Sequence, residues 1–152
     1  MNWFVALAVS VVLPLAAVAS EEPKAREPAK ESDEKPCLTH FTEEGSFFKG
    51  KTYKTWQEFP NADKAAVFQN VAQAVATNNW GSVNANKDLG IITAGQAVTM
   101  GSGSVAPLNV VVKQKSGGPV RVEASFGTGG MQRASSETVR TELCKLLEAA
   151  VE

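Results

Sequence analysis

The chain has 152 residues and a formal net charge of −1, with 43% hydrophobic and 20% charged side chains. This ordinary balance excludes a largely disordered chain, and the near-neutral charge gives no electrostatic basis for binding DNA or RNA. The length allows one domain with a hydrophobic core and is too short for two.

The first segment, residues 1–20, is predicted to be a cleaved signal peptide. Residues 2–20 carry no charge, and the apolar run Trp3–Leu15 is shorter than the roughly 20 residues of a membrane-spanning helix. Small residues follow it, so cleavage before Ser20 or before Glu21 fits the usual pattern. With cleavage, we expect a periplasmic or secreted mature protein without a transmembrane span. The alternative is that this segment stays uncleaved as an N-terminal anchor.

The next segment, residues 21–36, is predicted to be a charged flexible linker. Six of its residues are acidic, four are basic and three are proline. It has no aromatic or β-branched side chain, so it cannot bury enough apolar surface to offset the entropy of ordering. Residues 37–152 are then expected to form a single domain.

The two cysteines, Cys37 and Cys144, are expected to form a disulfide. Export would bring them into an oxidising compartment, and the bridge would join the start of the domain to its last helix. The alternative is two free thiols. The Cys-x-x-Cys spacing of redox and zinc sites is absent, and we expect no metal or cofactor.

One or two strands are predicted near the start of the domain. Residues 41–59 are rich in threonine and aromatic residues, and Gly45 and Gly50 mark turns among them. The best strand candidate is Lys51–Trp56.

A helix is predicted over Ala62–Asn78, because its apolar residues recur with a helical period. Its N-cap is either Asn61 or Asp63. The helix is expected to end at residues 78–81.

Four strands are predicted after this helix. The last two alternate apolar and polar residues and are joined by a hairpin turn at residues 116–119. A mobile loop over Thr99–Pro107 would separate the first pair from the second. The four strands are Ser82–Asn86, Gly90–Val98, Leu108–Gln114 and Val120–Phe126.

A second helix is predicted to close the domain, with Ser135 or Ser136 as its N-cap. Its apolar face consists of Val139, Leu143, Leu146, Leu147 and Ala150. The element order predicts an α+β fold, with an antiparallel β-sheet of about four to six strands and two helices packed on one face.

Candidate catalytic groups are few. His40 is the only histidine, and a disulfide-bonded Cys37 beside it could not act as a nucleophile. The glycine-rich segment 127–130 lacks the full glycine pattern of a nucleotide-binding loop. Four carboxylates have no spacing that would pair them, and we expect them on the solvated surface. They are Glu43, Glu44, Asp88 and Glu123.

Aromatic residues gather near the start of the domain and form the candidate partner surface: Phe47, Phe48, Tyr53 and Trp56. Such side chains anchor many protein interfaces. The alternative interpretation, which the small size of the sheet favours, is that they belong to the core.

A helix followed by a hairpin with an Asp-x-Gly-x-Ile-x-Ala turn runs through about thirty residues. The residues that carry this motif are Phe68, Val71, Ala74, Val75, Trp80, Val83, Lys87, Asp88, Gly90, Ile91, Ile92, Thr93 and Ala94. This stretch resembles small bacterial periplasmic and envelope domains, and distantly the repeated domains of the outer-membrane-assembly lipoprotein BamC. The resemblance implies an envelope accessory or binding module. The lipid-accepting cysteine of the lipoprotein relatives is absent.

Together these features predict an exported accessory or binding protein that acts through contacts with an envelope or secreted protein, without catalysis. Two alternatives remain open. One is a small inhibitor or immunity protein that blocks a hydrolase with the loop Thr99–Pro107, and the other is an enzyme of unknown reaction.

Overall fold

The structure of the protein, a computed structural model, describes residues 35–99 and 105–152. The predicted signal peptide and nearly all of the predicted linker lie outside the described residues. The described part is an α+β fold, in which helices pack on an antiparallel sheet of six strands. This confirms the predicted fold class.

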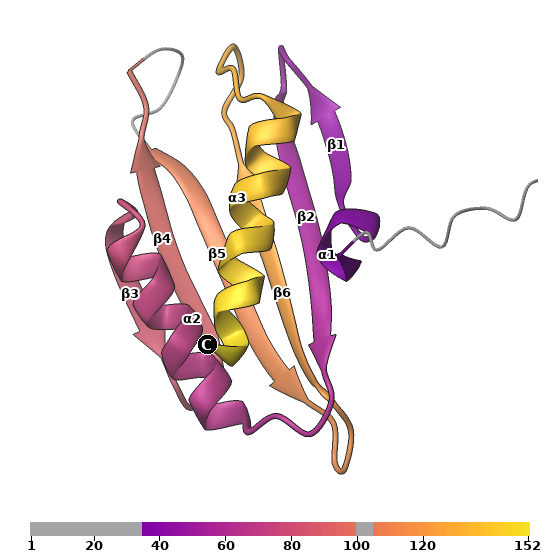
Figure 1. Ribbon diagram of the computed structural model, residues 1–152. Coiled ribbons are helices and arrows are strands. Elements are labelled where there is room, and N and C mark those ends of the chain that lie inside the picture. The colour runs from indigo at the N-terminus through magenta and orange to yellow at the C-terminus, as the bar shows by residue number, and fades with distance from the viewer. Residues whose placement is uncertain (1–34, 100–104) are drawn as a thin grey trace, which may run out of the picture. The chain divides into compact units, whose positions relative to one another are not determined.

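The sheet has the strand order β1-β2-β6-β5-β4-β3, and every neighbouring pair is antiparallel (Figure 1). The pairing of β2 with β6 places the beginning of the domain beside its last strand. The bounds are β1 Thr42–Ser46, β2 Gly50–Phe59, β3 Gly81–Asn86, β4 Ile91–Ala97, β5 Val105–Gln114 and β6 Val120–Gly127.

The predicted hairpin is formed by β5 and β6, whose register runs from Leu108 opposite Phe126 to Gln114 opposite Val120. Strand β5 begins earlier than its apolar alternation indicated. The segment Val105–Pro107 was expected in a loop, but it continues the ladder with β4, in which Pro107 lies opposite Gly95. The rest of that expected loop, residues 100–104, lies outside the described residues.

Both long helices begin with a side-chain cap. The Asp63 carboxylate accepts a hydrogen bond from the Ala66 amide at 2.8 Å, and the Ser135 hydroxyl accepts one from the Thr138 amide at 3.4 Å. Asp63 and Ser135 are therefore the N-caps, and each is one of the two candidates that the sequence offered for its helix. The helices are α1 Pro36–Thr39, α2 Lys64–Thr77 and α3 Ser136–Glu148, and the short 3-10 helix η1 Ala149–Val151 follows. The single turn of α1 was not predicted.

Helices α2 and α3 cover the same face of the sheet, and the core lies between them and the strands (Figure 1). The expected apolar face of α3 is buried there, as are Val67, Phe68, Val71 and Val75 of α2. No helix among the described residues is long and apolar enough to cross a bilayer.

The sulfur atoms of Cys37 and Cys144 lie at disulfide distance, with their Cα atoms 5.5 Å apart. This pair joins α1 to α3 across a separation of 107 residues. The hydroxyl of Thr55 also donates a hydrogen bond to the Cys37 carbonyl, so α1 is held against β2 as well.

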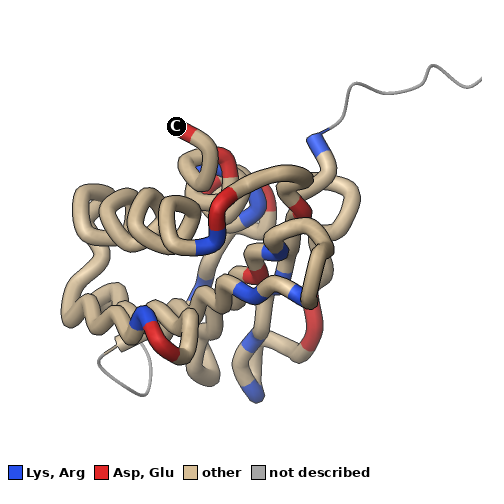
Figure 2. Tube along the Cα trace, turned by 90° about the horizontal axis from the view of Figure 1, so that it is seen from below, with Lys and Arg blue, Asp and Glu red and all other residues tan. Residues whose placement is uncertain are grey.

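Charged residues are distributed unevenly over the fold. Between Ala65 and Val112 the sequence contains only two, Lys87 and Asp88. As a result α2, β3 and β4 are almost free of charge, whereas charges follow one another closely along β1, β2, β6 and α3 (Figure 2).

Candidate functional site

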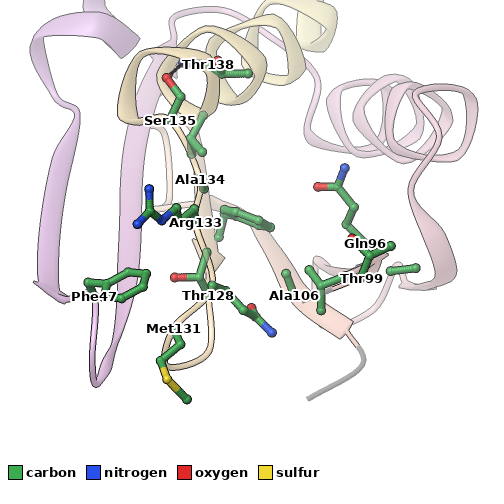
Figure 3. A pocket seen from close by; sticks show the side chains of 15 residues that line it. Phe47, Gln96, Thr99, Ala106, Thr128, Met131, Arg133, Ala134, Ser135 and Thr138 are labelled. Atoms are coloured by element: carbon green, nitrogen blue, oxygen red, sulfur yellow. Dashed lines mark hydrogen bonds between the residues drawn. The ribbon is translucent and has the colours of Figure 1, made fainter. Parts of the chain in front are cut away.

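The two long helices leave part of the helix-covered face of the sheet open. Helix α3 packs on β2 and β6, whereas α2 packs on β3 and β5. Between the start of α3, the end of β4 and the start of β5 lies a cleft of about 780 Å³ (Figure 3). We call it the α3 cleft. Its fifteen lining residues are Phe47, Gln96, Ala97, Val98, Thr99, Ala106, Phe126, Thr128, Met131, Gln132, Arg133, Ala134, Ser135, Thr138 and Val139.

The β4 side chains that face the helices explain why the cleft is open at this end. Ile92 and Ala94 point toward the helices and are buried, with 0% and 8% of their surfaces exposed. Gln96 is the next residue with this orientation, but it is exposed and its side chain extends toward α3 (Figure 3). A polar side chain therefore stands where the core pattern would place an apolar one.

The floor of the cleft is apolar. Ala106, Phe126 and Val139 contribute buried side chains, with 1%, 6% and 8% of their surfaces exposed. Thr128 and Thr138 also line the cleft, and the hydroxyl of Thr128 is hydrogen-bonded with the backbone of Lys51 (Figure 3). An apolar surface with a few polar groups is the usual composition of a small-molecule site, and the volume lies in the usual range of about 300–1,000 Å³.

One wall of the cleft is a loop between β6 and α3 that hydrogen bonds hold against the β1–β2 turn. The Met131 amide donates to the Phe47 carbonyl at 2.7 Å, and the Thr128 amide donates to the Lys51 carbonyl at 2.8 Å. Within the loop, the buried Gln132 side chain accepts a hydrogen bond from the Gly129 amide at 2.7 Å. These bonds give the wall a defined shape without a ligand.

Arg133 stands on the rim of this wall and is exposed. Its guanidinium carbon lies 5.3 Å from the ring centroid of Phe47, the distance of a cation–π contact. Among the residues that the structure describes, it is the only charged one that lines the cleft.

A second hollow of about 250 Å³ continues the cleft along α3. It shares Gln96, Phe126, Thr138 and Val139 with the first, and these residues join the two. Trp80 and Glu142 line its far end. The ring of Trp80 meets that of Phe126 edge-on, with centroids 5.7 Å apart.

The four aromatic residues of the candidate partner surface do not form one surface. Tyr53 is fully buried in the core, with its hydroxyl 3.3 Å from the Ala134 carbonyl, so it cannot contact a partner. Phe47 lines the α3 cleft, and Phe48 is 80% exposed at the β1–β2 turn. Trp56 belongs to the opposite face of the sheet, because the side chains of successive strand residues alternate between faces.

The face of the sheet without helices carries an aromatic and charged group around Trp56. The His40 ring stacks on the indole of Trp56 with centroids 3.5 Å apart, and the Arg121 guanidinium carbon lies 3.8 Å from the indole centroid. Arg121 also pairs with Glu58 at 3.7 Å and with Glu123 at 2.7 Å, the latter without the angle of a hydrogen bond. These contacts orient the indole and neutralise the arginine charge.

The candidate catalytic groups are engaged in structural contacts. His40 and Glu123 line the same shallow hollow, but the Nδ1 atom of His40 is 3.0 Å from the Trp56 carbonyl oxygen and Glu123 is paired with Lys113 as well as Arg121. The described residues include no group of three or more histidine, cysteine or acidic side chains placed to hold a metal ion.

Among the carboxylates of residues 35–99 and 105–152, Glu43 is the one whose pKa is clearly shifted. Hydrogen bonds from Lys51 and then from the hydroxyl of Ser136 lower its pKa below the usual 4.5. Its role is to connect the edge strand β1 to the first residue of α3. No second carboxylate of the four sequence candidates contacts it in the described structure, so there is no acid–base pair at this place.

The sequence analysis did not identify the α3 cleft. One signal was available: Gln96 continues the inward positions of Ile92 and Ala94 with a polar residue. Comparison of the sequence with models of known families gives no match, and comparison with curated proteins gives none either.

Proposed function

We propose that this protein is an exported, non-catalytic binding module that takes a small, largely apolar ligand in the α3 cleft. The observation that carries this proposal is the cleft itself, a hollow of about 780 Å³ with an apolar floor, the polar side chain of Gln96 and a hydrogen-bonded wall. A cavity with these properties gains affinity by removing apolar ligand surface from water, at about 25 cal/mol per Å².

Export is supported by the uncharged N-terminal segment and by the Cys37–Cys144 pair, which is typical of proteins that fold in an oxidising compartment. The resemblance to envelope domains points in the same direction. Absence of catalysis is supported by the engagement of His40 in contacts with Trp56 and by the ion pairs of Glu123 with Lys113 and Arg121.

The test is binding of Nile red, a neutral apolar dye that fluoresces when it leaves water, to the protein recovered after expression of the full chain. Gln96→Phe would fill the cleft from an exposed position and should abolish the fluorescence increase. Asn109→Phe is the matched control, because Asn109 is exposed on the other face of the sheet. No saturable binding, or equal loss in both variants, would refute the cleft as the site.

A second candidate function is contact with an envelope or secreted protein through the face around Trp56. The half-buried indole is oriented by His40 and Arg121, and a side chain that is already immobilised loses little entropy on binding. Partner capture from envelope extract should then fail with Trp56→Ala and persist with Gln96→Phe. Capture of a single hydrolase would favour the inhibitor alternative.

A further inference from the structure

We propose that the α3 cleft selects a single-chain anionic amphiphile, with its carboxylate at Arg133 and its apolar chain along the underside of α3. This inference rests on the proposed function of the cleft as a ligand site. It adds the chemical class of the ligand and its direction in the cleft.

The charge of the lining residues indicates the sign of the charge on the ligand. Arg133 is the only charged side chain among the fifteen lining residues, and none of the ion pairs among the described residues includes it. None of the described acidic residues contributes to this lining. A guanidinium without a carboxylate partner offers paired N–H donors that match a carboxylate, whereas an ammonium group would be repelled.

The position of Arg133 indicates where the head group lies. Arg133 lies with Phe47 and Met131 on the loop side of the cleft, across from Gln96 and Ala106 (Figure 3). Met131 is 56% exposed, so this side is open to solvent. A carboxylate at this rim stays partly hydrated, so its burial costs little. The chain attached to it would then pass over Phe126 toward the interior.

The second hollow indicates the direction of the chain. It begins at the shared residues Thr138 and Val139, and Glu142 lines its far end. A negative head group would be repelled there, although Lys145 pairs with Glu142 at 2.8 Å and reduces the effect. The two ends of the continuous cleft therefore differ in charge, which favours one orientation of an anionic amphiphile.

The length of the cleft indicates the size of the chain. Along α3, the two hollows are lined from the N-cap Ser135 to Leu143. Over these residues the axis of an α-helix rises by about 12 Å. An extended chain of about ten carbons has this length. We therefore choose decanoate as the probe, with decanol and decylammonium as neutral and cationic probes of equal chain length.

The experiment measures displacement of Nile red from the protein by each probe, below the concentrations at which the probes form micelles. Decanoate should bind about fivefold more tightly than decanol, the upper end for an exposed charge pair, and decylammonium should bind most weakly. Arg133→Gln should remove the preference for decanoate. Arg140→Gln should retain it, because Arg140 belongs to α3 but does not line the cleft.

Each outcome separates this inference from the proposed function. If decanol and decanoate bind equally, or if the preference survives in Arg133→Gln, the inference is wrong and the cleft remains a ligand site. If no probe displaces Nile red although Gln96→Phe abolishes its binding, the inference is wrong and the cleft remains a ligand site. If Gln96→Phe leaves Nile red binding unchanged, the cleft is not the site and both proposals fail. Circular dichroism of each variant establishes that it is folded.

Discussion

The imidazole ring of His40 stacks on the indole of Trp56, with ring centroids 3.5 Å apart and planes within 9° of parallel. The same histidine uses its Nδ1 atom for a 3.0 Å hydrogen bond with the Trp56 carbonyl. Two contacts thus connect the residue after α1 to the middle of β2. They hold the beginning of the domain on the sheet beside the face that has no helices.

His40→Ala should therefore destabilise the protein. The lost aromatic contact contributes about 0.5–1.5 kcal/mol and the lost hydrogen bond about 1 kcal/mol, so we expect a decrease of about 1.5–2.5 kcal/mol in the free energy of unfolding. Urea denaturation followed by circular dichroism measures it without interference from changes in indole fluorescence. Thr39→Ala, which removes only an exposed hydroxyl contact with Pro36, is the control. Equal losses in both variants would contradict this role of His40.

The Cys37–Cys144 pair should contribute strongly to stability, because it restricts the unfolded chain across 107 residues. Cys37→Ser and Cys144→Ser are each expected to lower the free energy of unfolding by about 2–5 kcal/mol. The double variant should lose little more, since either substitution already breaks the same bond. Additive losses would show that the sulfur atoms are not bonded, and mass spectrometry under non-reducing conditions provides an independent check.

Glu43 should make the stability depend on pH in the acidic range. Its pKa in the folded protein is lowered, so the stabilisation is present above the usual value of 4.5 and is lost as the pH falls through the folded-state pKa. Glu43→Gln should have a lower urea midpoint than the native protein at neutral pH. The two midpoints should converge as the pH falls below 4.5.

The matched control for Glu43 is Glu44→Gln on the same strand. Glu44 pairs with Lys54 at 3.2 Å in an exposed position and does not contact α3. Exposed pairs of this kind contribute little. A pH-independent difference between Glu43→Gln and the native protein would contradict the assigned contacts with Lys51 and Ser136.

Gly50 should tolerate no side chain, because β2 approaches the β6–α3 loop closely at this residue. It has a φ of +94°, and a Cβ atom there would lie 2.3 Å from the Thr128 carbonyl oxygen. Gly117 has a similar φ of +71° with nothing within 4 Å. Gly117→Ala should cost about 1 kcal/mol from backbone strain alone, and Gly50→Ala should cost clearly more in thermal unfolding. Equal costs would show that the loop moves away freely.

Much of the fold was predictable from local patterns. The alternation in β5 and β6 predicted their hairpin, and the helical period of α2 and α3 predicted which side chains they bury. For each of these helices, the sequence restricted the N-cap to one of two residues. These features depend on residues close in sequence, so the sequence contains the information directly.

The failures of prediction have a common cause. The single turn of α1 has no amphipathic period, and it is held by Cys144 and Thr55, which are far away in the sequence. Val105–Pro107 joins β5 because β4 supplies a paired strand. The group of His40, Trp56 and Arg121 requires the pairing of β2 with β6, for which the sequence offers no local signal.

The sequence by itself determined the order of the two long helices and the last four strands, the α+β class, the buried side of each amphipathic element and the two cysteines available for a bridge. Only the tertiary structure decided that α2 and α3 pack on different strands and leave Gln96 facing an open cleft, with Arg133 on its rim. The physical reason is that burial periodicity records whether a side chain faces the core. The space between two elements depends instead on how distant segments pack, and side-chain size alone does not specify it.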